Sequence, residues 1–164
     1  MASSSFGLTV TFIGDNSANF GTMSPGEYKK ISTNNTNSYT YCNELQVQSD
    51  VNNPWQVRID ADPMTHSTRP SVQITSGFRW FATAGLYDTV SWNDFTAGID
   101  KPGFNDFSSE RNSLVYTSGK CTPNDNKNDT LGGNTEIQFQ YDVVMPSNAT
   151  AGDYSTTITF TVTQ

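Results

Sequence analysis

Charged residues are scarce in this sequence, since only 15% of its 164 residues are Asp, Glu, Lys or Arg, against about 25% in a typical domain. The nine Lys and Arg are outnumbered by 16 Asp and Glu, which gives a net charge of −7. A groove that binds nucleic-acid phosphates needs clustered Lys and Arg. The composition therefore argues against nucleic acid as a partner.

Long hydrophobic runs are absent as well. No stretch reaches the 18 or more apolar residues that indicate a membrane-spanning helix. The first six residues, Met-Ala-Ser-Ser-Ser-Phe, contain neither the basic region nor the apolar run of a signal peptide. We therefore expect no membrane insertion.

Small polar residues take the place of strong helix formers. The chain contains 22 Thr, 18 Ser and 16 Asn; all three types are disfavoured inside helices, whereas Thr is favoured on sheet surfaces. Aromatic residues still make up 12% of the sequence, which argues against disorder, because disordered chains are poor in aromatics. The length is that of one domain, and we expect a single domain over residues 1–164 with residues 1–5 as a flexible lead.

Cysteine and histidine are rare. The chain has two cysteines, Cys42 and Cys121, and one histidine, His66, which makes a four-ligand zinc site implausible. A disulfide between the cysteines would close the long loop between positions 42 and 121, and would contribute about 4–5 kcal/mol on a chain-entropy model. Two separate reduced cysteines are the alternative that the sequence leaves open.

Three Asn-X-Ser/Thr triplets, at Asn34, Asn128 and Asn148, are candidate sites of N-glycosylation. A chain rich in Asn and Thr also produces such triplets by chance. Together with the expected disulfide, they favour an extracellular or cell-surface location. We interpret the chain as a secreted protein in which Met1 replaces the targeting signal.

Residues suited to catalysis are few. His66 lies in the turn-like segment Asp62–Ser67, so a Ser-His-Asp triad would depend on one exposed loop residue. Asp60 and Asp62 share a face of a predicted strand, about 6–7 Å apart, but we expect that face to be exposed to solvent, unlike the facing carboxylates of a glycosidase. No glycine-rich phosphate loop is present. The sequence therefore predicts a protein that is not an enzyme.

Apolar and polar residues alternate over much of the chain, which is the period of half-buried strands. The predicted strands are 6–12, 44–49, 55–62, 71–75, 78–83, 112–118, 137–143 and 156–163. The spacing of 44–49 and 55–62 predicts a hairpin. Residues 87–110 are the least regular stretch, and we expect an irregular loop region there.

Short strands with one apolar face each, separated by Gly, Pro, Asn and Asp, predict an all-β fold. We expect a two-sheet antiparallel β-sandwich of about 8–9 strands, immunoglobulin-like or jelly-roll-like. The last strand carries a row of Thr on its polar face, which is usual for an antiparallel sheet with one side in water.

Three parts of the chain carry a resemblance to known proteins. They are Asn19–Gly26 after the first strand, Asn53–Ile59 in mid-chain, and Met145–Pro146 with Ala151–Tyr154 before the last strand. In these parts the chain resembles immunoglobulin-like modules of prokaryotic secreted and cell-surface proteins, and more loosely the pilin-like sandwich subunits of extracellular filaments. The resemblance implies a β-sandwich with a structural role outside the cell.

A segment rich in oxygen ligands follows Cys121. Calcium prefers such ligands, and the candidate residues are Asn124, Asp125, Asn126, Asn128 and Asp129. Further acidic candidates lie in the irregular region at Asp88, Asp94, Asp100 and Asp106. Asn and Asp also stabilise turns on their own, so an ordinary polar loop is the alternative to a calcium cofactor.

Aromatic residues cluster in and before the irregular region. On the rim of a sandwich such residues can stack on sugar rings or anchor a partner, and the candidate patch is Trp80, Tyr87 and Trp92. The alternative is that these residues close one end of the core. A carbohydrate-binding or adhesive module, with glycans as partners, is therefore the second function that we consider.

The first function is that of a non-enzymatic structural protein that assembles with copies of itself into a surface filament, pilus, tubule or layer. We expect assembly by β-strand addition, with Phe6, Leu8, Val10 and Phe12 in the segment 3–12 as the apolar positions of the added strand. Few Lys residues guard the terminal strands against such pairing. The alternative is that this strand simply pairs within its own sandwich.

Overall fold

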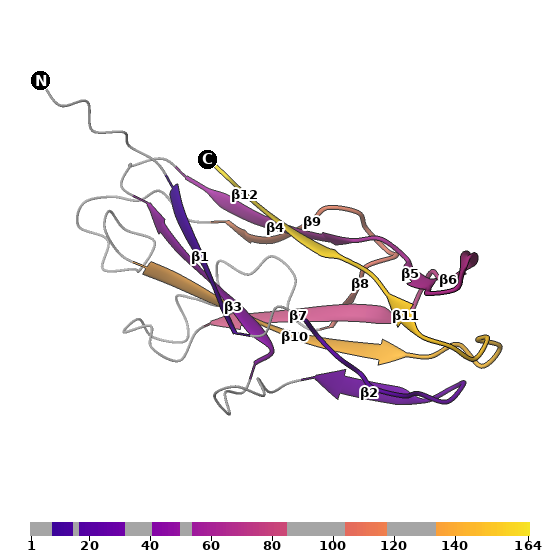
Figure 1. Ribbon diagram of the computed structural model, residues 1–164. Helices are drawn as coiled ribbons and strands as arrows, with labels where there is room; N and C mark the ends of the chain where they lie inside the picture. Colours follow the sequence, from indigo (N-terminus) through magenta and orange to yellow (C-terminus); the bar gives the residue numbers. More distant parts are fainter. Residues whose placement is uncertain (1–7, 15–16, 32–40, 50–53, 85–103, 118–133) are drawn as a thin grey trace, which may run out of the picture.

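The computed structural model describes residues 8–14, 17–31, 41–49, 54–84, 104–117 and 134–164 (Figure 1). Within these ranges the chain forms twelve strands and no helix. The strands are β1 (Leu8–Gly14), β2 (Tyr28–Ile31), β3 (Asn43–Ser49), β4 (Gln56–Ala61), β5 (Met64–His66), β6 (Arg69–Ile74), β7 (Phe78–Ala84), β8 (Asn105–Asp106), β9 (Ser113–Thr117), β10 (Asn134–Val144), β11 (Tyr154–Ser155) and β12 (Ile158–Thr163). No helix that could cross a membrane occurs in the described part of the chain.

All strand pairs are antiparallel. The largest sheet has the order β1-β3-β10-β7-β8, and β2 also pairs with β10. The long strand β10 pairs with β7 along one edge. Along its other edge it pairs with two strands, with β3 at Asn134–Phe139 and with β2 at Tyr141–Val144. Two smaller sheets have the orders β12-β4-β9 and β11-β5-β6.

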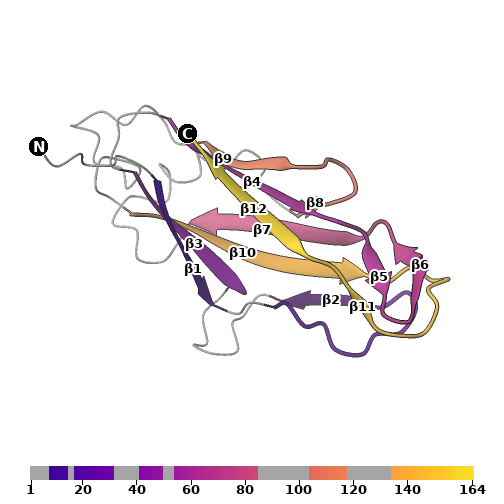
Figure 2. The ribbon, with the colours of Figure 1, turned by 45° about the horizontal axis from the view of Figure 1, so that its top comes forward.

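The sheet of β12, β4 and β9 packs face to face on the largest sheet, which makes the molecule a β-sandwich (Figures 1 and 2). Trp55, Val57 and Ile59 supply the core from the β4 side, and Ile137 and Phe139 supply it from β10; all are at most 2% exposed. Each such side chain stabilises the fold by about 1.5–3 kcal/mol through burial. The core therefore lies between β4 and β10.

The alternation that predicts these strands is confirmed. Val57, Ile59 and Ala61 of β4 are buried between half-buried polar neighbours, and Thr159, Thr161 and Thr163 of β12 are exposed as a row. The all-β antiparallel fold is therefore as predicted.

Two details of the prediction are wrong. Strands β3 and β4 do not form a hairpin, because β3 lies in the largest sheet and β4 in the second sheet. Alternation is the same for a strand that turns back within a sheet and for one that crosses to the other layer. The count exceeds the expected 8–9 because β2, β5, β8 and β11 have only two to four residues each, too few to show a period.

Candidate functional site

The first strand lies at one edge of the largest sheet with its apolar side incompletely covered. β1 pairs with β3 so that Val10 lies opposite Val47 and Phe12 opposite Leu45. Directly opposite residues of antiparallel strands point to the same face, and Leu45 and Val47 are buried in the core. Val10 and Phe12 therefore face the second sheet, yet they are 45% and 40% exposed.

The last strand lies at the corresponding edge of the second sheet. The ring of Phe160 in β12 is centred 6.1 Å from that of Phe12 and 4.8 Å from that of Phe139. Phe160, Ile158 and Val162 are only partly buried against the core. Strands β1 and β12 thus flank the same side of the sandwich, which we call the open edge.

The open edge has little protection against pairing with another strand. Among the described residues β1 pairs only with β3, and β12 pairs only with β4, so each strand presents one side of its backbone without a strand partner. Natural edge strands are usually guarded by charged side chains or Pro. Neither β1 nor β12 contains a charged residue or a Pro.

The predicted assembly residues lie at this edge. Leu8, Val10 and Phe12 are in β1, while Phe6 lies outside the described residues. β1 is paired with β3 of its own chain. This pairing within its own sandwich is the alternative that the sequence leaves open for the strand.

The predicted aromatic patch needs one correction. Trp80 is fully buried in β7 opposite Tyr141, because the alternation of β7 turns Phe78 and Trp80 toward the core. It is therefore not a surface platform for sugars. Tyr87 and Trp92 lie outside the described residues.

Most of the other predicted sites also fall outside the described residues. These are Cys121 of the expected disulfide, the sequon residue Asn34, and the calcium candidates Asn124, Asp125, Asn126, Asn128, Asp129, Asp88, Asp94 and Asp100. Cys42 is fully buried beside β3. In the described ranges no three His, Cys, Asp or Glu side chains are grouped to hold a metal ion. The disulfide and the calcium site stay predictions.

The interpretation of His66 as an exposed loop residue is wrong. His66 is 3% exposed and ends strand β5. Its Nδ1 accepts a hydrogen bond from the Thr68 N–H at 3.2 Å, so its Nε2 carries the proton and donates to the Ala151 carbonyl at 3.1 Å. Both ring nitrogens therefore form hydrogen bonds with the backbone.

Asp60 and Asp62 form a surface cluster with Arg111. The Arg111 guanidinium lies 2.8 Å from an oxygen of each carboxylate, which raises the pKa of Arg111 through the hydrogen bonds to Asp62 and Asp60. Because Arg111 forms ion pairs with both carboxylates and the Asp62 side chain is 76% exposed, this pair lacks the buried, facing arrangement of a glycosidase.

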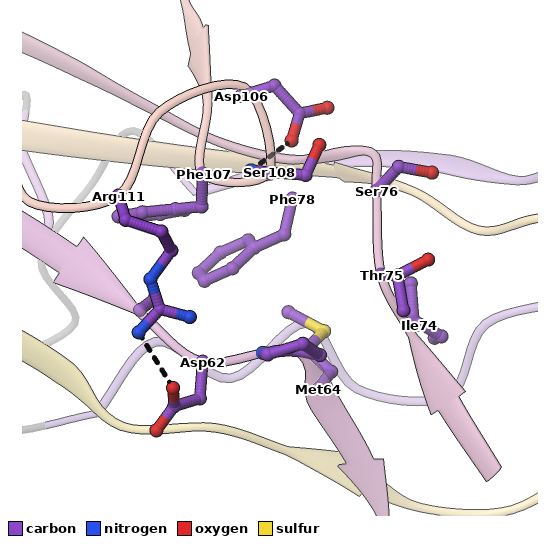
Figure 3. A pocket seen from close by; sticks show the side chains of 12 residues that line it. Asp62, Met64, Ile74, Thr75, Ser76, Phe78, Asp106, Phe107, Ser108 and Arg111 are labelled. Carbon is purple, nitrogen blue, oxygen red and sulfur yellow. Dashed lines mark hydrogen bonds and ion pairs between the residues drawn. The ribbon is translucent and has the colours of Figure 1, made fainter.

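A small hollow lies beside this cluster (Figure 3). Its volume is about 190 Å³, with Met64, Ile74, Phe78 and Phe107 as its apolar floor. Ligand pockets usually measure about 300–1,000 Å³, so this hollow is too small to be the default ligand site. Figure 3 shows the ion pair of Arg111 and Asp62 at its mouth.

Asp106, one of the further calcium candidates, has a structural role at the rim of this hollow. Its carboxylate accepts hydrogen bonds from the backbone N–H groups of Gly77 and Ser108, both at 2.8 Å. Partial burial raises the pKa of Asp106, but the hydrogen bonds from Ser108 and Gly77 and the nearby charge of Arg79 outweigh it. The pKa therefore lies below the usual value.

Sequence reasoning missed two polar clusters on the outer face of the largest sheet. In one, the Gln46 amide donates to Glu44 at 3.1 Å and to Glu136 at 3.0 Å. In the other, Arg79 binds the fully buried Asp142 at 2.8 and 2.7 Å. The only sequence signal is polar residues at outward positions, which by itself predicts solvent exposure.

Comparisons with known proteins add no assignment. No protein-family model matches the chain, and a search of curated proteins finds no relative.

Proposed function

We propose that the chain is a non-enzymatic extracellular structural protein, a subunit that assembles with copies of itself into a surface filament, tubule or layer by β-strand addition. The observation that carries the proposal is the open edge, where β1 leaves core-facing Val10 and Phe12 exposed and β12 leaves its apolar side chains only partly buried. Val10 and Phe12 are two of the four large hydrophobic residues found exposed in the described chain.

Strand addition would supply the open edge with backbone hydrogen bonds and with apolar cover. A neighbouring strand would form backbone hydrogen bonds with the free side of β1 or β12, which is the usual source of affinity in β-augmentation. Its apolar side chains would also cover Val10 and Phe12. Since each is about half exposed, covering them would contribute roughly 1 kcal/mol apiece.

The partner strand is supplied by a second copy of the chain. β1 presents Leu8, Val10 and Phe12 on one face and Thr9 and Thr11 on the other, the pattern that a strand entering the same sandwich layer needs. Edge-to-edge pairing in this manner joins the sheets of successive subunits, while each β1 stays paired with its own β3.

The variant Val10→Lys tests this role of the open edge. A charge that points inward from an edge strand opposes pairing with another strand, and Val10 is exposed enough for the monomer to tolerate Lys. We expect sedimentation velocity to show large assemblies of the wild type and monomers of the variant.

Ser71→Lys is the matched control. It places the same charge at an exposed position of β6, the terminal strand of a different sheet, and should leave assembly unchanged. Equal assembly of Val10→Lys and the wild type would contradict the proposal.

A further inference from the structure

A sequon lies in an exposed turn at the end of β10. Asn148, Ala149 and Thr150 form an Asn-X-Thr triplet, and Asn148 is exposed. The turn is closed by a hydrogen bond from the Ala149 N–H to the Pro146 carbonyl at 3.0 Å. Thr150 contributes its backbone carbonyl to the fold, as acceptor of the Tyr154 hydroxyl at 2.8 Å. The sequon is therefore accessible to a modifying enzyme without unfolding a strand.

Two of the four exposed large hydrophobic residues in the described chain are not part of the open edge, and they lie beside this turn. Tyr28 of β2 and Val144 of β10 lie directly opposite each other, and they are 53% and 40% exposed. Two backbone hydrogen bonds of 2.9 Å, from Gly26 to Met145 and from Met145 to Glu27, hold the chain before β2 against the start of the turn. Val144 precedes Asn148 by four residues.

The Tyr28 ring is held in place by a hydrogen bond to β10. Its hydroxyl donates to Asp142 at 3.2 Å, and Asp142 is fixed by the bidentate contact with Arg79. Burial and the neighbouring Asp142 charge raise the pKa of Tyr28, so its hydroxyl stays protonated near neutral pH. An aromatic ring fixed in this way offers an apolar surface on which the apolar face of a sugar can lie.

We infer that Asn148 carries an N-linked glycan whose first sugars lie on the surface formed by Tyr28 and Val144. The donor would be a lipid-pyrophosphate-linked oligosaccharide. Asn148 Nδ2 forms a bond to C1 of the first sugar and loses a proton, while the bond from C1 to the pyrophosphate oxygen breaks and the lipid pyrophosphate leaves. The inference rests on the extracellular location in the proposed function, but not on self-assembly.

The position of the turn is compatible with assembly. In both ribbon views, the loop that follows β10 lies at the opposite end of the molecule from the start of β1 and the end of β12 (Figures 1 and 2). A glycan on Asn148 would therefore leave that end of the open edge accessible.

Mass spectrometry of the full chain, secreted from a host cell that N-glycosylates, tests the site. We expect the peptide with Asn148 to carry sugar in the wild type and in Thr150→Ser, which keeps the sequon. Thr150→Ala and Asn148→Gln should lose it. An unmodified Asn148 in the wild type would overturn the inference, whatever the state of assembly.

Thermal unfolding tests the surface on which the sugar lies. Enzymatic removal of the glycan should lower the Tm of the wild type and of Tyr28→Phe, which keeps the ring. The same treatment should change the Tm of Tyr28→Ser far less. An equal change in all three proteins would show that the glycan does not rest on Tyr28, and an unchanged Tm in the wild type would show the same.

Discussion

The backbone of Gly152, in the loop before β11, lies close against the His66 ring of β5. A Cβ added to Gly152 would lie 2.1 Å from His66 Nε2, and the backbone of Gly152 has a φ of 150°, which L side chains rarely adopt. The His66 ring also packs edge-on against Tyr154, with centroids 5.1 Å apart. Only glycine therefore allows the loop to approach the imidazole.

This contact predicts a strong effect of Gly152→Ala. Overpacking against a buried ring, together with the unfavourable φ, should lower the free energy of unfolding by about 2–3 kcal/mol, measured by urea denaturation. Gly26→Ala is the control, because Gly26 has a φ of 80° but open space around it. It should cost about 1 kcal/mol through its backbone alone. Equal losses in both variants would contradict a steric role for His66.

Asp106 makes a prediction about pH. Its pKa is lowered in the folded chain, so its carboxylate stabilises the fold above its unfolded pKa of about 3.9, and this stability is lost as the pH falls through the lower folded value. In Asp106→Asn the free energy of unfolding should therefore fall less steeply as the pH is lowered from about 5 toward 3. Urea denaturation at several pH values measures both slopes, and identical slopes would count against this role.

Residue positions differ in how well the sequence predicts them. Val57 and Ile59 are buried as the alternation requires, because a long strand with one apolar face has one stable orientation. The sequence pattern predicts His66 and Trp80 at the surface, but both are buried. Residue type does not decide such cases, because burial of an imidazole or an indole depends on partners that are distant in the sequence.

Strand positions can be predicted from the sequence, but strand pairing cannot. Alternation predicts the strands of five or more residues near their observed positions, since each is long enough for the period to show. Which strands pair was not predictable, as the absent β3–β4 hairpin shows. The two halves of the open edge come from opposite ends of the sequence, β1 and β12, so their proximity could be found only in the folded chain.

A covalent lock tests how β1 takes part in assembly. Thr9 and Gln48 lie opposite each other on the outer face of β1 and β3, at a separation suited to a disulfide if both become Cys. Because strand addition uses the free side of β1, the oxidised variant Thr9→Cys/Gln48→Cys should still assemble, as judged by sedimentation. Assembly only after reduction would mean that β1 must leave its own sheet, which would contradict the edge-to-edge arrangement.

At the scale of the whole molecule, a sparsely charged surface and an open edge belong together. The 22 Thr and the few charged residues leave strand surfaces that hydrogen-bond well and repel a second copy weakly. In the part of the chain that the structure describes, the core closes between β4 and β10 but stays open between β1 and β12. Contact with a second copy at this edge would complete the core.

Electron microscopy of the purified full chain, with and without millimolar calcium, tests this central claim most directly. The open edge predicts filaments, tubules or sheets in which subunits repeat through β1 and β12. Calcium would alter their number or order only if the predicted calcium loop takes part. Single, unassembled molecules at every protein and calcium concentration would contradict the account.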